Sequence, residues 1–508
     1  MSKLMINFRL KAALGSAIPA LFLTGCMVGP KYHVPPATAQ APPVAYKESP
    51  TQFQDTDGWK VALPQDAMLR GKWWEIYNDP ELNALEDQLN INNQNIKQFF
   101  ENFMEARTLI AEARSQLYPT LTTAPSYSRS RSSSNLGSST IANPGHETSI
   151  GTLGLDASWE PDLWGKVRNT IHEQQYNAQL SAADLENERL TEQATLAVTF
   201  FEIRGQDALQ KVLDETVVAD TKALERTQSA YETGVDDKIS VVEAQNTLQN
   251  VQAAATNLGV ARAQFEHAIA VLVGANASSF SIPVKPVTAT PPPIPIGLPS
   301  QLLERRPDIA AAERNMAAAN AQIGIADAAF YPNLTLSATG GYESSTWKHL
   351  FDWPSRFWSI GPTVNETIYD AGLRRATVNQ FIATYNADVA SYRQTVLTAF
   401  QQVEDSLAAV RILSQQIQQQ QEAEQSAAQF VKLETARYET GIDPYIDVVT
   451  AQTTLLTDQQ TLTTLRIQRM TSSVQLIEAL GGGWDRSQLP TPAQVSKKLT
   501  KDETTIQR

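Results

Sequence analysis

The chain has 508 residues, a formal net charge of −13 at neutral pH and a single cysteine. The acidic balance offers no basic stripe for phosphate groups, which argues against a nucleic-acid partner. A single cysteine excludes an intrachain disulfide. Proline is absent from 162–282 and 363–443, and glycine is absent from 373–440. These spans are rich in Ala, Gln, Glu, Leu and Thr, which favours one elongated helical unit over several globular domains.

Residues 1–25 have the features of a secretory signal. Lys3, Arg9 and Lys11 precede an apolar stretch at positions 12–23. A positive region followed by a short apolar core is typical of an export signal. This apolar core is also too short to be a stable anchor that spans a bilayer.

The signal ends at a lone cysteine. The residues Leu23-Thr24-Gly25-Cys26 resemble the lipobox of bacterial lipoproteins. The resemblance implies cleavage before Cys26, a diacylglycerol thioether on its sulfur and acylation of its amine, as in palmitate-bearing lipoproteins. Two or more acyl chains give stable anchoring, and Met27, in place of an Asp, implies sorting to the outer membrane. The alternative is an ordinary signal peptide with an incidental cysteine.

Residues 26–70 are predicted to be an extended linker along the outside of the body. Prolines recur through it, and proline fits neither a regular helix nor a central strand. A helix is expected from Pro80 to Leu117, with Asp79 as its N-cap and leucines at helical spacing. Pro119 ends it.

Two strand pairs are predicted, one in each half of the chain. Apolar residues alternate with polar ones on both sides of a Ser-rich tract at 130–140, which predicts a strand pair over 120–160. A second pair is predicted over 333–368, with tryptophans in and beside its loop. Strands of about ten residues are long enough to cross a bilayer when tilted.

A very long helix is predicted after each strand pair. One runs from Gly165 to Gly234 and the other starts at Gly372. About 70 helical residues span on the order of 100 Å. Each helix ends in Tyr-Glu-Thr-Gly and a turn, which predicts helical hairpins over 231–240 and 438–445.

The hairpin turns follow helix-capping chemistry. Gly234 and Gly441 stand where a helix end favours positive φ, which glycine adopts without steric cost. In the second hairpin, Asp443 is expected to cap the next helix and Pro444 to occupy its first position. The two glycines are 207 residues apart, and this offset predicts a duplicated structure.

The duplication suggests the division of the chain. The first repeat covers 71–282 and the second covers 301–482, each with a helix, a strand pair, a long helix, a hairpin and a helix. A proline-rich connector at 283–300 separates them, and 483–508 is a C-terminal tail.

The four predicted strands are too few to close a β-barrel. They cannot form a barrel alone, and open sheet edges are not tolerated in lipid. The smallest ring with a usable lumen is a trimer of twelve strands, with lipid outside and water inside. Tryptophans near the loops fit an interfacial aromatic belt. The alternative is two soluble β-hairpins packed on helices.

Four groups of residues, spread over the mature chain, match the pattern of one family. They are Cys26-Met-Val-Gly-Pro-Lys-Tyr32, Trp73-Trp74 with Asp79-Pro80-Glu-Leu82, the segment from Leu298 to Ile309, and both Tyr-Glu-Thr-Gly hairpins. Together they resemble the outer-membrane factors of tripartite efflux pumps, the TolC-like lipoproteins. The resemblance implies an α+β membrane protein, a homotrimer with a twelve-stranded transmembrane β-barrel and a long α-helical tunnel in the periplasm.

The same resemblance implies a function. The trimer would be a passive exit duct for drugs or other small toxic compounds, as in multidrug resistance. A periplasmic membrane-fusion adaptor and an inner-membrane RND-type transporter would deliver the compounds. The adaptor would dock on the hairpin turns, at Gly234, Gly441, Asp443 and Pro444.

The family pattern also places a periplasmic constriction on the helix after the second hairpin. Asp447 and Thr450 match the positions of pore-lining acids, and Ile446 and Thr453 match further constriction positions. Three copies of Asp447 around a threefold axis would repel one another and favour bound cations. The alternative is a solvated acid in the first turn of a helix.

A tyrosine is expected to hold this constriction shut. Tyr438 matches a family tyrosine that bonds across helices. The matching partner position in the first hairpin is Ser240, and Glu243, one turn further along, is the other candidate.

No catalytic or metal-binding motif is found in the sequence. The five histidines are scattered without metal-ligand spacing, and no P-loop, dinucleotide fingerprint or G-x-S-x-G motif occurs. We therefore expect no enzyme, cofactor or metal. Two other interpretations stay open: export of proteins in a type I secretion system with the same fold, and a lipid-anchored periplasmic coiled-coil scaffold without a pore.

Overall fold

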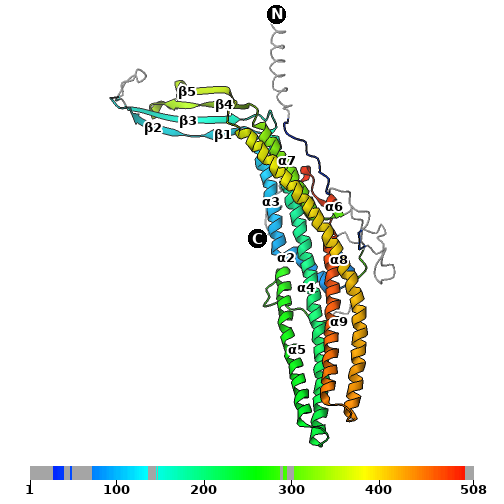
Figure 1. The fold of residues 1–508 in the computed structure, drawn as a ribbon. Coiled ribbons are helices and arrows are strands. Elements are labelled where there is room, and N and C mark those ends of the chain that lie inside the picture. Colours follow the sequence, from blue (N-terminus) through cyan, green and yellow to red (C-terminus); the bar gives the residue numbers. More distant parts are fainter. Residues whose placement is uncertain are drawn as a thin grey trace.

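The computed structural model describes residues 27–38, 46–48, 71–135, 145, 147–286, 290–294 and 302–497. The predicted signal and Cys26 lie outside this part of the chain. The molecule is elongated, with a sheet at one end and two helical hairpins at the other (Figure 1). No helix among the described residues combines the length and the apolar character that crossing a membrane requires.

Two pairs of helices form the long axis of the molecule. α4 (Lys166–Glu232) and α8 (Leu373–Glu439) each have 67 residues. α5 (Lys238–Leu272) and α9 (Tyr445–Ala479) each have 35 residues. Equivalent helices start 207 residues apart, as the hairpin offset predicts. At 1.5 Å per residue, α4 and α8 each span about 100 Å.

Shorter helices surround the upper half of these pairs. Those that pack on α4 are α2 (Pro80–Asn92), α3 (Gln94–Ser115), α7 (Pro307–Ala328) and the short α10 (Pro492–Val495). The remaining short elements are α6 (Leu302–Arg305) and the 3-10 helices η3 (Trp73–Tyr77), η5 (Trp347–His349), η6 (Trp353–Ser355) and η7 (Arg486–Gln488).

The helix predicted from Pro80 to Leu117 is divided at Asn93. Its side-chain oxygen accepts a hydrogen bond from the N–H of Ile96 at 3.0 Å and so caps α3. Its amide group donates to Glu192 of α4 at 3.1 Å and to the carbonyl of Leu272 at 3.0 Å. The prediction of one helix was wrong because these long-range contacts hold Asn93 at φ −57° and ψ 129°, outside the helical region.

The strands form one antiparallel sheet. They are β1 (Thr120–Thr123), β2 (Ser126–Arg131), β3 (Glu147–Trp159), β4 (Asn333–Ser344) and β5 (Arg356–Asn365). Their order is β1-β3-β4-β5, and β2 also pairs with β3. The sequence predicts four strands. The first is divided because Pro125, between β1 and β2, has no N–H for the ladder.

The strand register gives the sheet two different faces. Residues directly opposite one another share a face, and alternate residues of each strand lie on opposite faces. One set of partners is Leu121, Ala157, Ala338 and Ile360, and the next set is Thr122, Asp156, Thr339 and Ser359. We call the first side the apolar face; it carries Leu121, Leu153, Leu155, Ala157, Trp159, Leu334, Leu336, Ala338, Tyr342, Trp358, Ile360 and Val364.

The main hydrophobic core lies beside the middle of α4. It combines side chains from η3, α2, α4, α5, α7, α8 and α9, among them the fully buried Trp73, Phe200 and Met316. A buried ion network centred on Asp207 adjoins the core. Asp207 accepts from Arg262 of α5 at 2.7 Å and from Arg204 at 3.4 Å. This network ties α4 and α5 together where they enter the upper half.

Segments near the two ends of the described chain meet at Glu313 of α7. The hydroxyl of Tyr32 donates to Glu313 at 2.6 Å, and Arg486 of the tail donates to the same carboxylate at 3.2 Å. Nearer the sheet, the N–H of Val28 donates to the carbonyl of Trp164 at 3.0 Å. The segment after Cys26 therefore lies against the junction between sheet and helices.

Candidate functional site

The candidate site lies where the two hairpins end, furthest from the sheet (Figure 1). Gly234 and Gly441 have φ of 72° and 74°, the positive values that the sequence predicts. The N–H groups of Val235 and Ile442 each donate to a carbonyl five residues back, both at 2.9 Å. The two turns therefore close in the same way.

The capping prediction for Asp443 was wrong. Pro444 is the N-cap of α9, and no side chain caps this helix. Asp443 instead accepts from the guanidinium of Arg437 in α8, with one contact at 3.0 Å. The Arg437 guanidinium lowers the pKa of Asp443 below its usual range. A two-pronged charge-assisted pair with the preceding helix is stronger than a single bond to a helix N–H. In the first hairpin, Asp237 caps α5.

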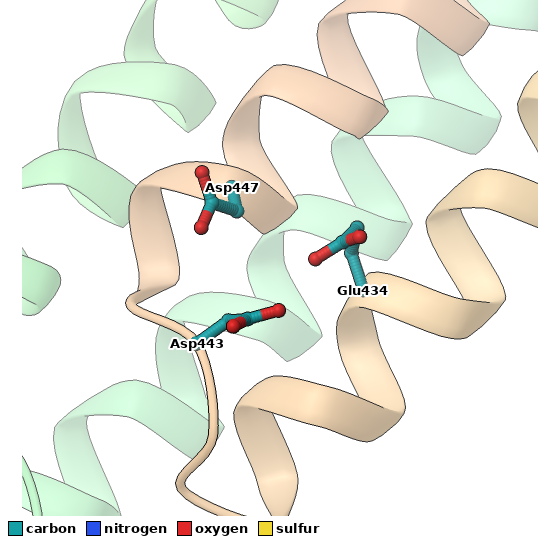
Figure 2. A group of neighbouring side chains, drawn as sticks. All are labelled: Glu434, Asp443 and Asp447. Atoms are coloured by element: carbon teal, nitrogen blue, oxygen red, sulfur yellow. The ribbon is translucent and has the colours of Figure 1, made fainter.

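Three acidic side chains gather at the second hairpin (Figure 2). Carboxylate oxygens of Glu434, Asp443 and Asp447 lie within 4.8 Å of one another. Burial, and then the charge of Asp443, raises the pKa of Glu434. Carboxylate oxygens are suitable ligands for hard cations, but Arg437 already pairs with one of the three acids. The cluster is explained by this ion pair, and sequence reasoning missed the contribution of Glu434 from the preceding helix.

Tyr438 links the second hairpin to the first. Its hydroxyl donates to Asp236, whereas the expected partners were Ser240 and Glu243. Ser240 donates to the other oxygen of Asp236 at 2.9 Å, so it supports the acceptor. Asp236 lies in the turn before α5, whereas Ser240 and Glu243 lie within the helix. The Asp236-Asp237 doublet after Gly234 was the available sequence signal.

The surroundings of this hydrogen bond shift the pKa values of Tyr438 and Asp236. Burial, and then the bond to Asp236, raises the pKa of Tyr438 to about 12. Burial acts to raise the pKa of Asp236, but hydrogen bonds from Tyr438, the N–H of Asp237 and Ser240 lower it overall. At neutral pH the tyrosine therefore donates to a carboxylate, which is a charge-assisted hydrogen bond.

A small buried cluster surrounds this hydrogen bond. The ring of Tyr438 meets the ring of Tyr445 edge-on, with centroids 5.2 Å apart. Tyr445 packs with Ala244 of α5 and Val448 of α9. All four long helices thus contribute near the hairpin end, because Leu224 of α4 also packs on this cluster.

Asp220 of α4 is a further acid that sequence reasoning missed. Its side chain lies near Tyr445, and its charge helps to raise the pKa of that tyrosine. The residue is 3% exposed, and its Oδ2 atom has no hydrogen-bond partner among the described residues. Burial raises its pKa to about 6. Nothing in the local sequence distinguishes it from a solvated helix acid.

The predicted constriction residues lie on the first turns of α9. Ile446, Thr450 and Thr453 are exposed, and Asp447 is half-buried. The hydroxyl of Thr450 donates to the carbonyl of Ile446 at 2.9 Å. These four residues share the outer side of α9 at helical spacing. Their pore-lining role stays a prediction.

Comparison with known proteins gives the family. A model of the outer membrane efflux protein family matches residues 85–275 and 298–482. The chain is similar to the toluene efflux pump outer membrane protein TtgC of Pseudomonas putida. The two are 31% identical over 477 residues, which cover 93% of this chain and 96% of that protein.

Solved structures give the fold. The outer-membrane channel OprN aligns with a TM-score of 0.80 and 24% identity, over 90% of this chain and 100% of that one. The outer membrane protein VceC of Vibrio cholerae aligns with a TM-score of 0.73 and 28% identity, over 81% of this chain and 99% of that one. The predicted α+β, TolC-like fold class is confirmed, with an open sheet in the single chain. The chain belongs to the outer membrane efflux protein family.

Proposed function

We propose that the protein is the outer-membrane channel of a tripartite efflux system. Three copies form a passive exit duct for drugs or other small toxic compounds. A periplasmic adaptor and an inner-membrane RND-type transporter deliver these compounds to the helical end. The name of a similar protein, the toluene efflux pump outer membrane protein TtgC, supports this class of transported compound.

The two-faced sheet with two open edges is the observation that carries the proposal. Among the described residues, β5 on one side and β1 with β2 on the other have no further strand partner. Ile360 and Trp358 on the apolar face are 74% and 78% exposed in the single chain. Lipid contact on one face, and edges paired with the next copy, account for both features.

The hairpin turns support docking of an adaptor. Val235, Ile239 and Ile442 beside the turns are 82%, 66% and 65% exposed. Apolar side chains at the tip of a helical hairpin are suited to helix-on-helix contacts with a partner. In this proposal the turns at Gly234 and at Gly441, Asp443 and Pro444 are the docking surface.

The cluster around Tyr438 supports a gate. Its bond to Asp236 joins α8 to the α4–α5 hairpin within one copy. Asp447, Ile446, Thr450 and Thr453 line the constriction of the trimer in this proposal, and a ring of three Asp447 carboxylates repels anions. Opening requires the α8–α9 hairpin to move relative to the α4–α5 hairpin, which breaks the Tyr438 bond.

Lipid attachment at Cys26 is part of the proposal. The docking of Val28 at the junction of sheet and helices supports it, because the acyl chains then start near the proposed membrane level. Mass spectrometry of the mature protein should find two or more acyl chains on Cys26. The Cys26→Ser variant should lack them and leave the outer-membrane fraction in part. An unmodified mature Cys26 contradicts this part of the proposal.

The function is tested by deleting the gene and measuring susceptibility to dyes, antibiotics and solvents. We expect susceptibility to several compounds to rise, and the wild-type gene to restore resistance. The purified protein should run as a heat-sensitive trimer. A monomer in detergent, or unchanged susceptibility with loss of a secreted protein, contradicts the proposal; the second result favours type I secretion.

The gate is tested by conductance in planar bilayers. Tyr438→Phe removes a charge-assisted bond worth about 1.5–3 kcal/mol in each copy, and Asp447→Ala removes the acidic ring. We expect the double variant to conduct several-fold more than the wild type. The matched control combines Tyr231→Phe, at the equivalent position of the first repeat, with Asp214→Ala on the exposed side of α4. Equal conductance of the double variant and the control contradicts the gate.

A further inference from the structure

Aromatic side chains lie on the apolar face at the end of the strands furthest from the helices. Tyr127 of β2 stacks on Trp347, with centroids 5.5 Å apart. Tyr342 of β4 meets Phe351 edge-on at 5.7 Å. Since Tyr127 and Tyr342 belong to the apolar side by register, the β4–β5 loop folds onto that side. Aromatic rings at the end of an apolar band mark the boundary between hydrocarbon and headgroups.

Arginines accompany these rings on the same side: two lie beyond Tyr127 in β2, and one in β5 is level with Tyr342. In β2, Arg129 and Arg131 continue the alternate positions that start at Tyr127. Arg356, the first residue of β5, pairs with Tyr342 and so shares its side. Arg129 is 65% exposed and pairs with Glu147. Arg356 lies over the ring of Trp353, which is 74% exposed. Along β2 the outward face thus passes from aromatic to cationic side chains.

Closing the ring brings the arginines of two copies to one subunit boundary. Arg129 and Arg131 lie on one edge of the sheet, and Arg356 lies on the opposite edge. β2 ends, and β5 begins, on the side of the sheet away from the helices (Figure 1). Pairing β5 of one copy with the β1–β2 edge of the next is antiparallel and brings Arg356 to the same subunit boundary as Arg129 and Arg131. Glu147, which is opposite Arg131 and pairs with Arg129, offsets one of these three positive charges, so the boundary keeps a net positive charge.

We infer that each subunit boundary forms a three-arginine site, from Arg129 and Arg131 of one copy and Arg356 of the next, that binds the phosphate groups of an outer-leaflet glycolipid. This inference rests on the trimer proposed above. Arginine donates two parallel bonds to a phosphate. The site lies at headgroup level beside apolar and aromatic surface, so its occupant has both phosphates and acyl chains. Each cation near an anionic lipid surface adds attraction that salt weakens.

The test uses purified trimers in phosphatidylcholine nanodiscs. Bisphosphorylated lipid A and the same lipid stripped of its phosphates are titrated into wild-type trimer, with native mass spectrometry as the readout. The variant is Arg129→Gln with Arg131→Gln and Arg356→Gln. The matched control changes three exposed cations on the helices, Lys222→Gln, Lys432→Gln and Arg466→Gln. A second variant changes the same three arginines to lysine, which keeps the charge but loses the two-pronged geometry.

We expect up to three lipid A molecules on each wild-type trimer and on the control. The glutamine variant should bind lipid A at least ten-fold more weakly, and the lysine variant should be intermediate. The phosphate-free lipid should bind equally weakly to all four proteins. Equal lipid A affinity of wild type and glutamine variant, or equal affinity for both lipids, overturns the inference. Failure of the wild type to form trimers contradicts the proposed function instead. If the glutamine variant does not assemble, the lipid A affinity of the lysine variant is compared with that of the wild type. Equal affinities then overturn the inference.

Discussion

Replacing Asp220 with asparagine tests whether a buried carboxylate weakens the closed packing of the hairpins. Asp220, on α4, is 3% exposed and has one oxygen without a partner among the described residues. Tyr445 of α9 faces it, and Glu243 of α5 acts on the same tyrosine. Ionised Asp220 therefore disfavours the packed state. Asp220→Asn keeps the shape of the side chain and cannot ionise.

The sign and size of the effect follow from the pKa of Asp220. Burial raises it from 3.8 to about 6 in the packed state. The destabilisation is full above pH 6 and disappears as the pH falls towards 3.8, because the acid is then protonated in both states. A shift of about two units corresponds to about 3 kcal/mol. Water near the helix surface screens part of this, which leaves about 1–2 kcal/mol.

Amide hydrogen exchange in α5 and α9 near the hairpins measures this free energy. At pH 7.5 we expect exchange in Asp220→Asn to be about ten-fold slower than in the wild type, since 1.4 kcal/mol is a factor of ten. At pH 4.5 the ratio should shrink to about two-fold. The matched control is Asp214→Asn, an exposed acid about two turns earlier in α4, whose ratio should stay near one. A ratio for Asp220→Asn that does not change with pH refutes the reasoning, whatever its absolute size.

Three further substitutions test other parts of the fold. Asp207→Ala leaves Arg204 and Arg262 without their shared carboxylate, and the trimer should lose about 3–5 kcal/mol, seen as a lower melting temperature by circular dichroism. Gly441→Ala forces positive φ on alanine; we expect a loss of about 1 kcal/mol, measured by faster exchange of the hairpin amides, and no change contradicts this. Ile360→Lys on the apolar face should remove about 2–4 kcal/mol per copy and deplete trimers from outer membranes; undiminished trimers contradict the lipid-facing assignment.

Local features of the sequence determined most of the elements. The long helices follow from the absence of proline and the scarcity of glycine over 67-residue spans, and the hairpins follow from Gly234 and Gly441. The strands follow from a two-residue alternation that also predicts which side is apolar. These features were predictable because each depends on backbone conformation and on neighbours within a few residues.

Only the tertiary structure decided which polar groups meet. Asn93 breaks a helix because Glu192 and Leu272 lie beside it. Tyr438 reaches Asp236, and Asp220 is buried, because helices far apart in the sequence pack side by side at the hairpin end. Which acid is solvated and which is buried depends on contacts across many tens of residues, and the pattern within one helix does not contain that information.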